Sequence, residues 1–523
     1  MNRFKHFFVT GWSSRIKPIV ADFFLSKTVR IAFLVSLSVL FVVTSYVWFV
    51  SFGRWKNWPT ISNKYDQLAI AFEHGSLALE RNPDPALLAL PNPYDPLARA
   101  KLKYPLDLSL YKGKYYLYFG PTPGLILAII QPLTISAIGD QYLVFAFVSG
   151  IFLFQLLLIL EIWKKFFQSV PAWVMSICII FIGLISPFPW LLMQARVYEA
   201  AISGGQFFFL AGLYFVFTAF HKETISLVKF FMGSVSWALA IGSRLTQALP
   251  IGFLIFMVVL LLIRNYRQNK LLSNLLYATI CLAIPLIIGI AILGWYDWAR
   301  FNSILETGFS YQLAGPNLQK YHNVLFSPVY IVPNLYDYLA MRPGILKAFP
   351  FIRSVAGTGA SKFPFTLLPK VYFSDSITGM IFSTPFFLLV AVAAIFFILI
   401  RKRKEENQNK RDDDKYLLPW IMVSLLGSFL FAFGLIITCF WVVTRYVADF
   451  MPPLALLGII IFWQGYRRLI ERPISLKLYQ TFGIGLMVIS NINSILLALS
   501  ANAPSFRSFD PLVWNQLISF FSR

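Results

Sequence analysis

Charged residues, histidine and cysteine are scarce in this chain of 523 residues, and the shortages exclude whole classes of protein. Only 13% of the residues are charged, whereas about a quarter are charged in a typical soluble domain. The composition therefore excludes an ordinary soluble protein. The three cysteines, Cys178, Cys281 and Cys439, all lie in apolar runs, which excludes a disulfide framework and a Cys-x-x-Cys metal site.

A nucleotide-binding loop and a cleavable signal peptide are also missing. Neither G-x-G-x-x-G nor G-x-x-x-x-G-K-[S/T] stands between a predicted strand and a predicted helix, so the glycine-rich loops that hold nucleotide phosphates are absent. The first 20 residues lack a small-residue cleavage site behind a short apolar core. We therefore interpret Val29 to Phe52 as a retained helix.

Apolar residues dominate what is present, at 58% of the chain, and the mean hydropathy is +0.68. This composition predicts an all-α polytopic membrane protein with membrane lipid as a partner, and we expect it in the plasma (inner) membrane. The formal net charge is +22. In a membrane protein, basic side chains fill cytoplasmic loops and face anionic lipid, so we predict no nucleic-acid partner.

About eleven stretches are apolar and long enough to cross a bilayer, which takes about 20 residues. They lie near residues 30–51, 141–162, 171–192, 203–220, 226–243, 246–263, 274–296, 379–400, 418–440, 447–465 and 480–500. One further run, Pro121 to Gly139, is interrupted by Pro123, Gly124 and Pro132. Because each proline removes a backbone donor and restricts its neighbour, we expect a short helix that dips into the membrane and returns.

Short basic clusters set the orientation of these helices. They are Lys164-Lys165, Lys222, Arg264 to Arg267, Arg401 to Lys404 and Arg467-Arg468. The positive-inside rule places them in the cytoplasm with the basic N-terminus. Successive spans can alternate in direction and keep every basic cluster in the cytoplasm only if the 121–139 run does not cross the membrane. The C-terminus is therefore expected on the extracytoplasmic side.

Two long segments then face the extracytoplasmic side, 52–140 and Tyr296 to about Asp375. We expect a catalytic transmembrane module over residues 1–310 that includes the loop 52–140. A second extracytoplasmic loop is expected over 311–378, and C-terminal transmembrane helices over 379–523.

The first of these loops begins with an amphipathic pattern. Lys64 to Glu80 has apolar residues at helical spacing, which predicts a helix lying on the membrane surface. Asp66 and Glu73 lie on nearly one face of it, and they are either simply its wet side or part of a site. A metal site of Asp66, Glu73 and His74 lacks the i, i+4 spacing of helical ligand motifs.

A hairpin is predicted further along the same loop. Asp107 to Phe119 alternates polar and apolar residues around a Lys112-Gly113 turn and continues as an aromatic strand. This hairpin is either a structural clip or a substrate contact.

Four arginines are expected at the extracytoplasmic boundary: Arg196, Arg244, Arg300 and Arg445. A single boundary arginine is usually an anchor at the membrane interface. The positive-inside rule does not favour arginine on the extracytoplasmic side. Four arginines there are therefore consistent with the binding of an anionic lipid or sugar-phosphate headgroup.

Several short pieces of the sequence are similar to a known superfamily. They are Tyr65-Asp66 followed by Leu68-Ala69, Tyr118 to Pro123, Arg196 to Glu199, Arg300 to Glu306, and Arg445-Tyr446 with Asp449 to Pro452. With the loop arrangement over residues 1–310, the chain resembles the GT-C superfamily of membrane glycosyltransferases, in the branch of the protein O-mannosyltransferases and aminoarabinose transferases.

The resemblance implies an enzyme that moves a sugar from a polyprenyl-phosphate carrier to an extracytoplasmic glycan, lipid or protein acceptor. Asp66 takes the position of the catalytic base, and Glu199 takes that of a second-loop acid that binds acceptor or metal. Tyr65 and Tyr198 belong to the matched pieces and are expected to contact substrate together with the four arginines. The lone Glu199 argues against a tightly held metal and leaves at most a weakly bound divalent cation such as Mg or Mn.

This chemistry fits what the sequence lacks. A sugar on polyprenyl phosphate already carries a leaving group, so the site needs only a base for the acceptor hydroxyl and cations for the departing phosphate. Direct displacement would invert the anomeric centre.

Two rival functions share these features. A flippase or transporter of lipid-linked saccharides should carry ionisable residues through the middle of its spans, where this chain has few. A polymerase or ligase would use diphosphate-linked donors, and the sequence does not separate it from the first hypothesis.

The topology gives a first testable prediction. Cysteines introduced on either side of residue 140 should react with a membrane-impermeant maleimide added from outside intact cells, because the 121–139 run returns to the side it left. Labelling of these positions only after permeabilisation would contradict the predicted count of spans.

Overall fold

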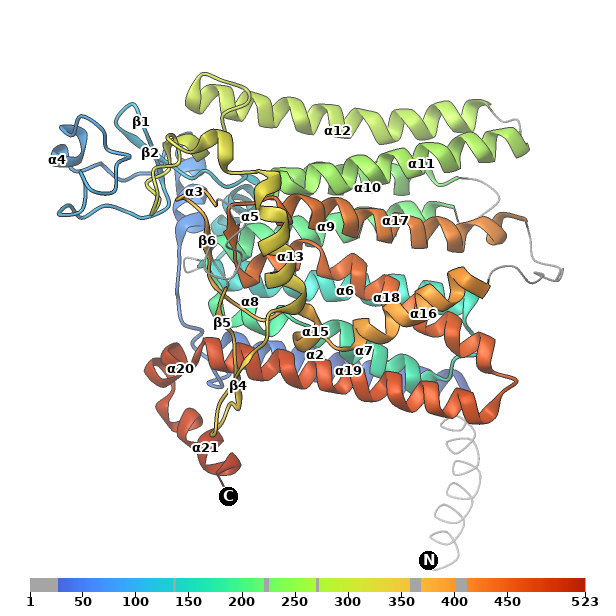
Figure 1. The fold of residues 1–523 in the computed structure, drawn as a ribbon. Coiled ribbons are helices and arrows are strands. Elements are labelled where there is room, and N and C mark those ends of the chain that lie inside the picture. The colour runs from blue at the N-terminus through green and yellow to red at the C-terminus, as the bar shows by residue number, and fades with distance from the viewer. Residues whose placement is uncertain are drawn as a thin grey trace, which may run out of the picture.

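Long apolar helices make up most of the computed structural model, which describes residues 27–134, 138–220, 225–269, 272–357, 368–400 and 412–522. The helices run side by side in one bundle (Figure 1). Eight of those described are long and apolar enough to cross a membrane, so the protein is an all-helical, multi-pass membrane type. The predicted basic N-terminus, Lys222 and Arg401 to Lys404 lie outside the described residues.

The eight candidate spans are formed by α2 (Lys27–Val50), α6 (Asp140–Phe166), α7 (Ala172–Leu184) with α8 (Phe188–Gln194), α9 (Val197–Ala219), α11 (Ala248–Asn269) with η2 (Leu245–Gln247), α12 (Leu272–Phe301), α17 (Asp412–Ile437) and α19 (Pro473–Ala501). Three shorter helices lie in the same bundle: α10 (Leu227–Ser243), α16 (Phe386–Ile400) and α18 (Met451–Leu469). These eleven positions match the eleven predicted stretches. The eight helices of spanning length do not by themselves establish eleven crossings.

The stretch predicted over 171–192 is confirmed as one candidate span but contains a break, and the start predicted for the next stretch is wrong. The stretch 171–192 is interrupted between α7 and α8, where Ile185 leaves the helical conformation just before Pro187, because proline has no N–H to continue the helix. The stretch 203–220 begins instead at Val197, so residues predicted as a loop form the first turn of α9.

One buried apolar core runs through the bundle, from Val42 on α2 to Trp514 near the C-terminus. Within it α9 packs between α6 and α10, α12 packs on α10, and α19 packs on α7 and α8. The outer face of α12 exposes Ile284, Ile287 and Trp298, as expected for a helix in contact with lipid.

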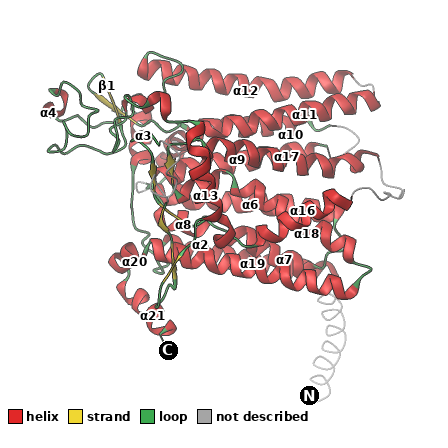
Figure 2. Cartoon of the chain, viewed as in Figure 1, coloured by secondary structure: helices red, strands yellow, loops and turns green. Residues whose placement is uncertain are grey.

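The connecting segments 51–134, 138–139, 302–357, 368–385, 438–450 and 502–522 gather at one end of the bundle, which we call the loop-rich end (Figure 1). Figure 2 shows the few strands of the protein there among loops. Its elements from the first segment are α3 (Lys64–Glu73), α4 (Pro85–Leu88), β1 (Ser109–Tyr111), β2 (Lys114–Tyr116), α5 (Thr122–Ile130) and η1 (Gln131–Leu133).

The later segments add short elements to the same end. They are η3 (Phe309–Tyr311), η4 (His322–Val324), η5 (Pro328–Tyr330), α13 (Ile331–Ala340), β3 (Gly344–Ile345), β4 (Ile352–Arg353), β5 (Val355–Ala356), β6 (Phe373–Ser374), β7 (Ser376–Ile377), α15 (Met380–Ser383), β8 (Trp441–Val442), η6 (Thr444–Asp449), α20 (Ala503–Phe509) and α21 (Pro511–Phe521). Strands β1–β2, β3–β4 and β5–β7 pair antiparallel, and β6 pairs parallel with β8. The second predicted extracytoplasmic segment, where it is described over 302–357 and 368–375, thus consists of loops, short helices and two-residue strands.

Helix α3 corrects the predicted surface helix in both length and environment. It ends at Glu73 and not at Glu80, because Gly75 adopts a φ of +70° and turns the chain away. Its apolar face packs on α5 so closely that a Cβ on Gly124 would lie 2.8 Å from Leu68. Asp66 is consequently only 6% exposed, so the interpretation of Asp66 and Glu73 as the wet side of a surface helix is wrong for Asp66, although Glu73 is exposed.

The hairpin and the non-spanning helix are confirmed. Ser109 pairs with Tyr116, and the turn places Lys112 and Gly113 both at positive φ, +47° and +73°, which is the geometry of a tight two-residue hairpin turn. Helix α5 has nine residues, roughly 14 Å at 1.5 Å per residue. It is too short to cross a bilayer core of about 30 Å.

Gly120 allows the loop after the hairpin to lie directly on the end of α10. A Cβ at this position would fall well inside van der Waals contact with the carbonyl oxygen of Gly242, and a backbone atom cannot rotate away. We predict that Gly120→Ala destabilises the detergent-solubilised protein by about 1–3 kcal/mol, measured as a lower melting temperature by intrinsic fluorescence. Gly485→Ala is the matched control, since nothing lies within 4 Å of its added Cβ. Equal melting temperatures for the two variants would contradict this account.

Candidate active site at the loop-rich end

All eight residues predicted to act in catalysis or binding lie at the loop-rich end, on five separate parts of the chain. They are Tyr65, Asp66, Arg196, Tyr198, Glu199, Arg244, Arg300 and Arg445. The fold brings Tyr198 and Arg445 into contact, whereas Arg244 and Arg300 form ion pairs with other residues of the protein.

Arg445 is the most unusual of these side chains. It is 7% exposed, and its guanidinium carbon lies 4.4 Å from the centre of the Tyr198 ring, 4.9 Å from Trp441 and 5.5 Å from Tyr446. Its Nε has no hydrogen-bond partner, and within the described part of the chain it forms no ion pair at 4 Å or less. A buried cation of this kind requires negative charge nearby.

Two carboxylates supply charge around Arg445 without closing an ion pair. Asp107 and Glu199 both interact electrostatically with it. Glu199 is 1% exposed, and its Oε2 accepts a hydrogen bond of 3.2 Å from the backbone N–H of Arg196. Glu199 therefore caps the start of α9, which is why the helix begins earlier than predicted.

Asp107 was not predicted as a site residue; the sequence interpretation gave it only a place at the start of the hairpin. Its carboxylate accepts a hydrogen bond from the Tyr198 hydroxyl and one of 2.9 Å from Nε2 of Gln312. Burial raises the pKa of Asp107, and the charges of Lys64 and Arg445 partly oppose this rise. An acid directly before an aromatic hairpin was the one signal that could have identified it.

Tyr118 completes this group, which we call the Arg445 cluster: Asp107, Tyr118, Tyr198, Glu199 and Arg445. Burial raises the pKa of Tyr118 well above its ordinary value; Asp107 adds to the rise, and Arg445 and Arg244 oppose it. The cluster thus joins the hairpin, the first turn of α9 and η6.

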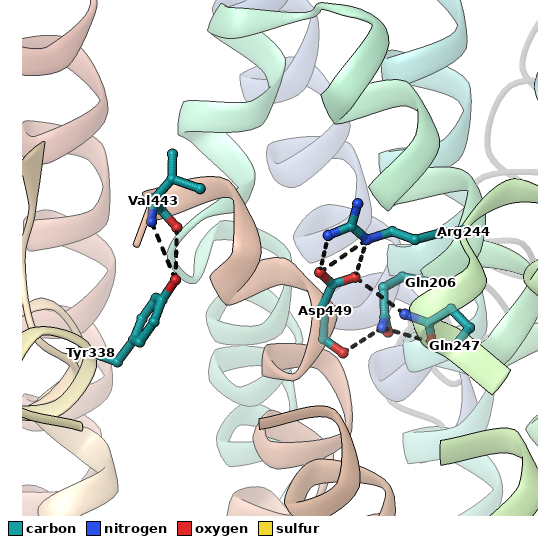
Figure 3. A network of polar contacts seen from close by, with 6 residues as sticks. All are labelled: Gln206, Arg244, Gln247, Tyr338, Val443 and Asp449. Carbon is teal, nitrogen blue, oxygen red and sulfur yellow. Dashed lines mark hydrogen bonds and ion pairs between the residues drawn. The ribbon is translucent and has the colours of Figure 1, made fainter. Parts of the chain in front are cut away.

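A second network holds η6 in place (Figure 3). Arg244 forms a bidentate ion pair with Asp449, with Nε 2.8 Å from Oδ1 and an Nη 2.7 Å from Oδ2. Gln247 donates to the same carboxylate at 3.2 Å, and Gln206 donates to the Asp449 carbonyl at 2.6 Å. The charge of Arg244 is therefore already balanced inside the protein.

The other end of η6 is held by Tyr338 on α13. Its hydroxyl accepts a hydrogen bond of 3.2 Å from the N–H of Val443, on the far side of η6 from Arg244 (Figure 3). Arg445 is positioned between these two fixed points.

Arg300 is also engaged within the protein. It lies 2.5 Å from Asp297 on its own helix, donates 2.7 Å to the carbonyl of Leu117, and its guanidinium lies 3.7 Å from the centre of the Tyr296 ring. These contacts tie α12 to the end of the hairpin. Its predicted part in substrate binding stays a prediction.

Asp66 lies between α3 and η1. It accepts a hydrogen bond from the side-chain amide of Gln131. Burial raises the pKa of Asp66; the Gln131 hydrogen bond lowers it and the charge of Glu73 raises it further. Within the described residues Asp66 forms no ion pair, and no arginine is among the groups that shift its pKa.

Its neighbour Tyr65 is fully buried, and its hydroxyl is hydrogen-bonded to the backbone of the protein. The Tyr65 hydroxyl donates 3.3 Å to the carbonyl of Gly120, while Asp140 accepts the backbone N–H groups of Lys64 and Tyr65 at 3.2 and 3.1 Å. Asp140, which the sequence interpretation overlooked, therefore stabilises the N-terminus of α3.

The weak metal site considered for Asp66, Glu73 and His74 is not formed. His74 instead lies 2.5 Å from Glu80, and both side chains are largely exposed. Among the residues that the structure describes, no three His, Cys, Asp or Glu side chains lie close enough to hold a metal ion.

No family model matches the sequence, and no curated protein matches it. The geometry of the Arg445 cluster is therefore the basis for a functional proposal.

The ion pair that fixes η6 gives a stability prediction. Asp449→Ala leaves the Arg244 guanidinium buried without its counter-charge, which should destabilise the protein by about 3–5 kcal/mol, seen as a lower melting temperature. The double variant Arg244→Met with Asp449→Leu should be less affected, because no buried charge is then left alone. An Asp449→Ala protein that melts with the wild type would refute the structural role of this pair.

Proposed function

We propose that this protein is an inverting glycosyltransferase that transfers a sugar from a polyprenyl phosphate to an acceptor on the extracytoplasmic side of the plasma (inner) membrane. The observation that carries the proposal is the buried Arg445 guanidinium, which lacks an ion pair among the described residues and lies near two carboxylates. An anion-binding group beside a possible base is the minimum that such a transfer requires.

The direction in which the helices run supports an extracytoplasmic position for the loop-rich end. Helix α6 starts at the loop-rich end and finishes with Lys164 and Lys165 at the opposite end, and α18 finishes there with Arg467 and Arg468. The positive-inside rule makes this opposite end cytoplasmic. If the shorter helices also cross, with 15 to 19 residues each, or roughly 22–28 Å, the chain crosses eleven times.

The Arg445 cluster suits a lipid phosphate. A guanidinium offers several N–H donors in one plane and can grip two phosphate oxygens at once. Nε of Arg445 has no hydrogen-bond partner among the described residues, whereas Arg244 is bound to Asp449. We therefore assign the departing phosphate to Arg445, with exposed Arg196 as a second contact and Arg244 as support for η6.

The two acids of the cluster differ in what they can do. Glu199 is fully buried and caps α9. We assign it the role of stabilising the positive charge of Arg445 and, by fixing the position of Arg445, of orienting the acceptor. The base that takes the acceptor proton is a separate carboxylate, for which the chain offers Asp66 and Asp107.

The binding role of Arg445 is testable with undecaprenyl phosphate and the purified full-length protein in lipid nanodiscs. Arg445→Ala should weaken binding tenfold or more, because a hydrogen bond to a charged group contributes about 1.5–3 kcal/mol and 1.4 kcal/mol is a factor of ten. Release of sugar from undecaprenyl-phosphate-linked mannose, glucose or arabinose should fall in parallel.

Arg507 is the matched control, since it is an exposed arginine at the same end whose guanidinium lies 5.6 Å from the Trp514 ring. Arg507→Ala should bind undecaprenyl phosphate as the wild type does. Equal binding by Arg445→Ala and wild type would refute the phosphate site. Tighter binding of undecaprenyl diphosphate, without sugar release from any monophosphate donor, would favour a polymerase or ligase instead.

A further inference from the structure

Asp107 is held in an unusual backbone conformation by two segments of the loop-rich end. Its φ is +61°, in the left-handed region that residues other than glycine rarely occupy. Its N–H donates 3.2 Å to the carbonyl of Leu313, and the N–H of Leu313 returns 2.9 Å to Leu108. These two hydrogen bonds between the 107–108 segment and Leu313 fix the backbone of Asp107 and therefore the direction of its side chain.

The carboxylate of Asp107 is fixed but not saturated. Each oxygen accepts one hydrogen bond, Oδ2 from Tyr198 and Oδ1 from Gln312, whereas a carboxylate has about four acceptor positions. Asp107 is half-buried, so it can still be reached from outside the protein. A base needs this combination of fixed direction and a vacant lone pair.

The charges around Asp107 come from several elements. Lys64 on α3 and Arg445 on η6 both favour its ionised form, and Tyr118 and Tyr198 are the titratable hydroxyls beside it. Burial outweighs the two cations, so the pKa of Asp107 is raised above the ordinary value for aspartate. A raised pKa makes the ionised carboxylate a stronger base.

Asp66 shares the raised pKa and accepts at most one hydrogen bond per oxygen, but no cation among the described residues acts on it. It is almost fully buried, its partner is the neutral amide of Gln131, and the charged neighbour that acts on it is Glu73. A base for sugar transfer has to lie close to the cation that holds the phosphate, and Tyr198 links the two, since its hydroxyl donates to Asp107 and its ring lies against Arg445.

We propose that Asp107 is the general base of the transfer, an inference that rests on the function proposed above. Asp107 takes the proton of the acceptor hydroxyl as the acceptor oxygen forms its bond to the anomeric carbon. The bond from that carbon to the phosphate oxygen breaks, and its electron pair leaves with the polyprenyl phosphate, whose charge Arg445 balances. Tyr198 is a positioning residue, because its ring lies against Arg445 while its hydroxyl donates to Asp107.

The test compares Asp107→Asn with wild type in nanodiscs, using the same undecaprenyl-phosphate-linked sugars and undecaprenyl phosphate alone. Sugar release should fall by about 10²–10⁴-fold, the usual contribution of a general base. Binding of undecaprenyl phosphate should be retained or become tighter, because a negative charge near Arg445 is removed. This split between turnover and binding would not result from a loss of folding.

The pH dependence supplies a second readout. Because only the ionised carboxylate accepts a proton, the wild-type rate should fall as the pH drops through the raised pKa of Asp107. Tyr198→Phe removes a donor that stabilises the ionised form, so this acid limb should move to higher pH. Asp107→Glu should restore part of the activity that Asp107→Asn loses.

Asp84→Asn is the control for a charge change in the same loop, since Asp84 is exposed and asparagine caps a helix equally well. Full turnover in Asp107→Asn, or a larger loss in Asp66→Asn than in Asp107→Asn, would overturn the assignment of the base. Wild-type protein that neither binds undecaprenyl phosphate nor releases sugar would overturn the proposed function itself.

Discussion

A buried guanidinium that forms no ion pair with the described residues is the constraint on which the loop-rich end depends. Moving an arginine out of water costs several kcal/mol unless charges or aromatic faces replace the lost hydration. Arg445 has the rings of Tyr198, Trp441 and Tyr446 around it, with two carboxylates at longer range. These groups reduce that cost without occupying the hydrogen-bonding edge of the guanidinium, which is the arrangement expected of a site that receives an anion.

The rest of the fold keeps this arginine in position. Its helix η6 is short and would not hold a fixed direction alone. The Arg244–Asp449 ion pair fixes one end of it, and Tyr338 fixes the segment before it (Figure 3). Arg244 directly follows α10, Tyr338 lies on α13, and Gln206 of α9 donates to the Asp449 carbonyl. The packing of the bundle therefore determines where Arg445 lies.

Sequence patterns predicted the secondary-structure elements of this site better than the contacts that these elements make with distant parts of the chain. The Lys112-Gly113 turn identified the hairpin, since few residue pairs tolerate two successive positive φ angles. The helix beginning at Lys64 was predicted too long and on a membrane surface, because α5 covers a face that looked amphipathic in one dimension. Asp107 was missed because nothing in the local sequence shows that Gln312, more than 200 residues later, donates to its carboxylate.

The sequence alone determined that the chain is an all-helical membrane protein, and it located the arginines at the ends of apolar stretches. These properties follow from local composition, since a bilayer selects about 20 apolar residues per crossing and excludes charge from its middle. Only the tertiary structure decided which arginine is paired with Asp449 and which lies near Asp107, because these contacts join residues 205 and more than 300 positions apart. Long-range pairing depends on the three-dimensional packing of the helices, and local residue patterns carry no record of it.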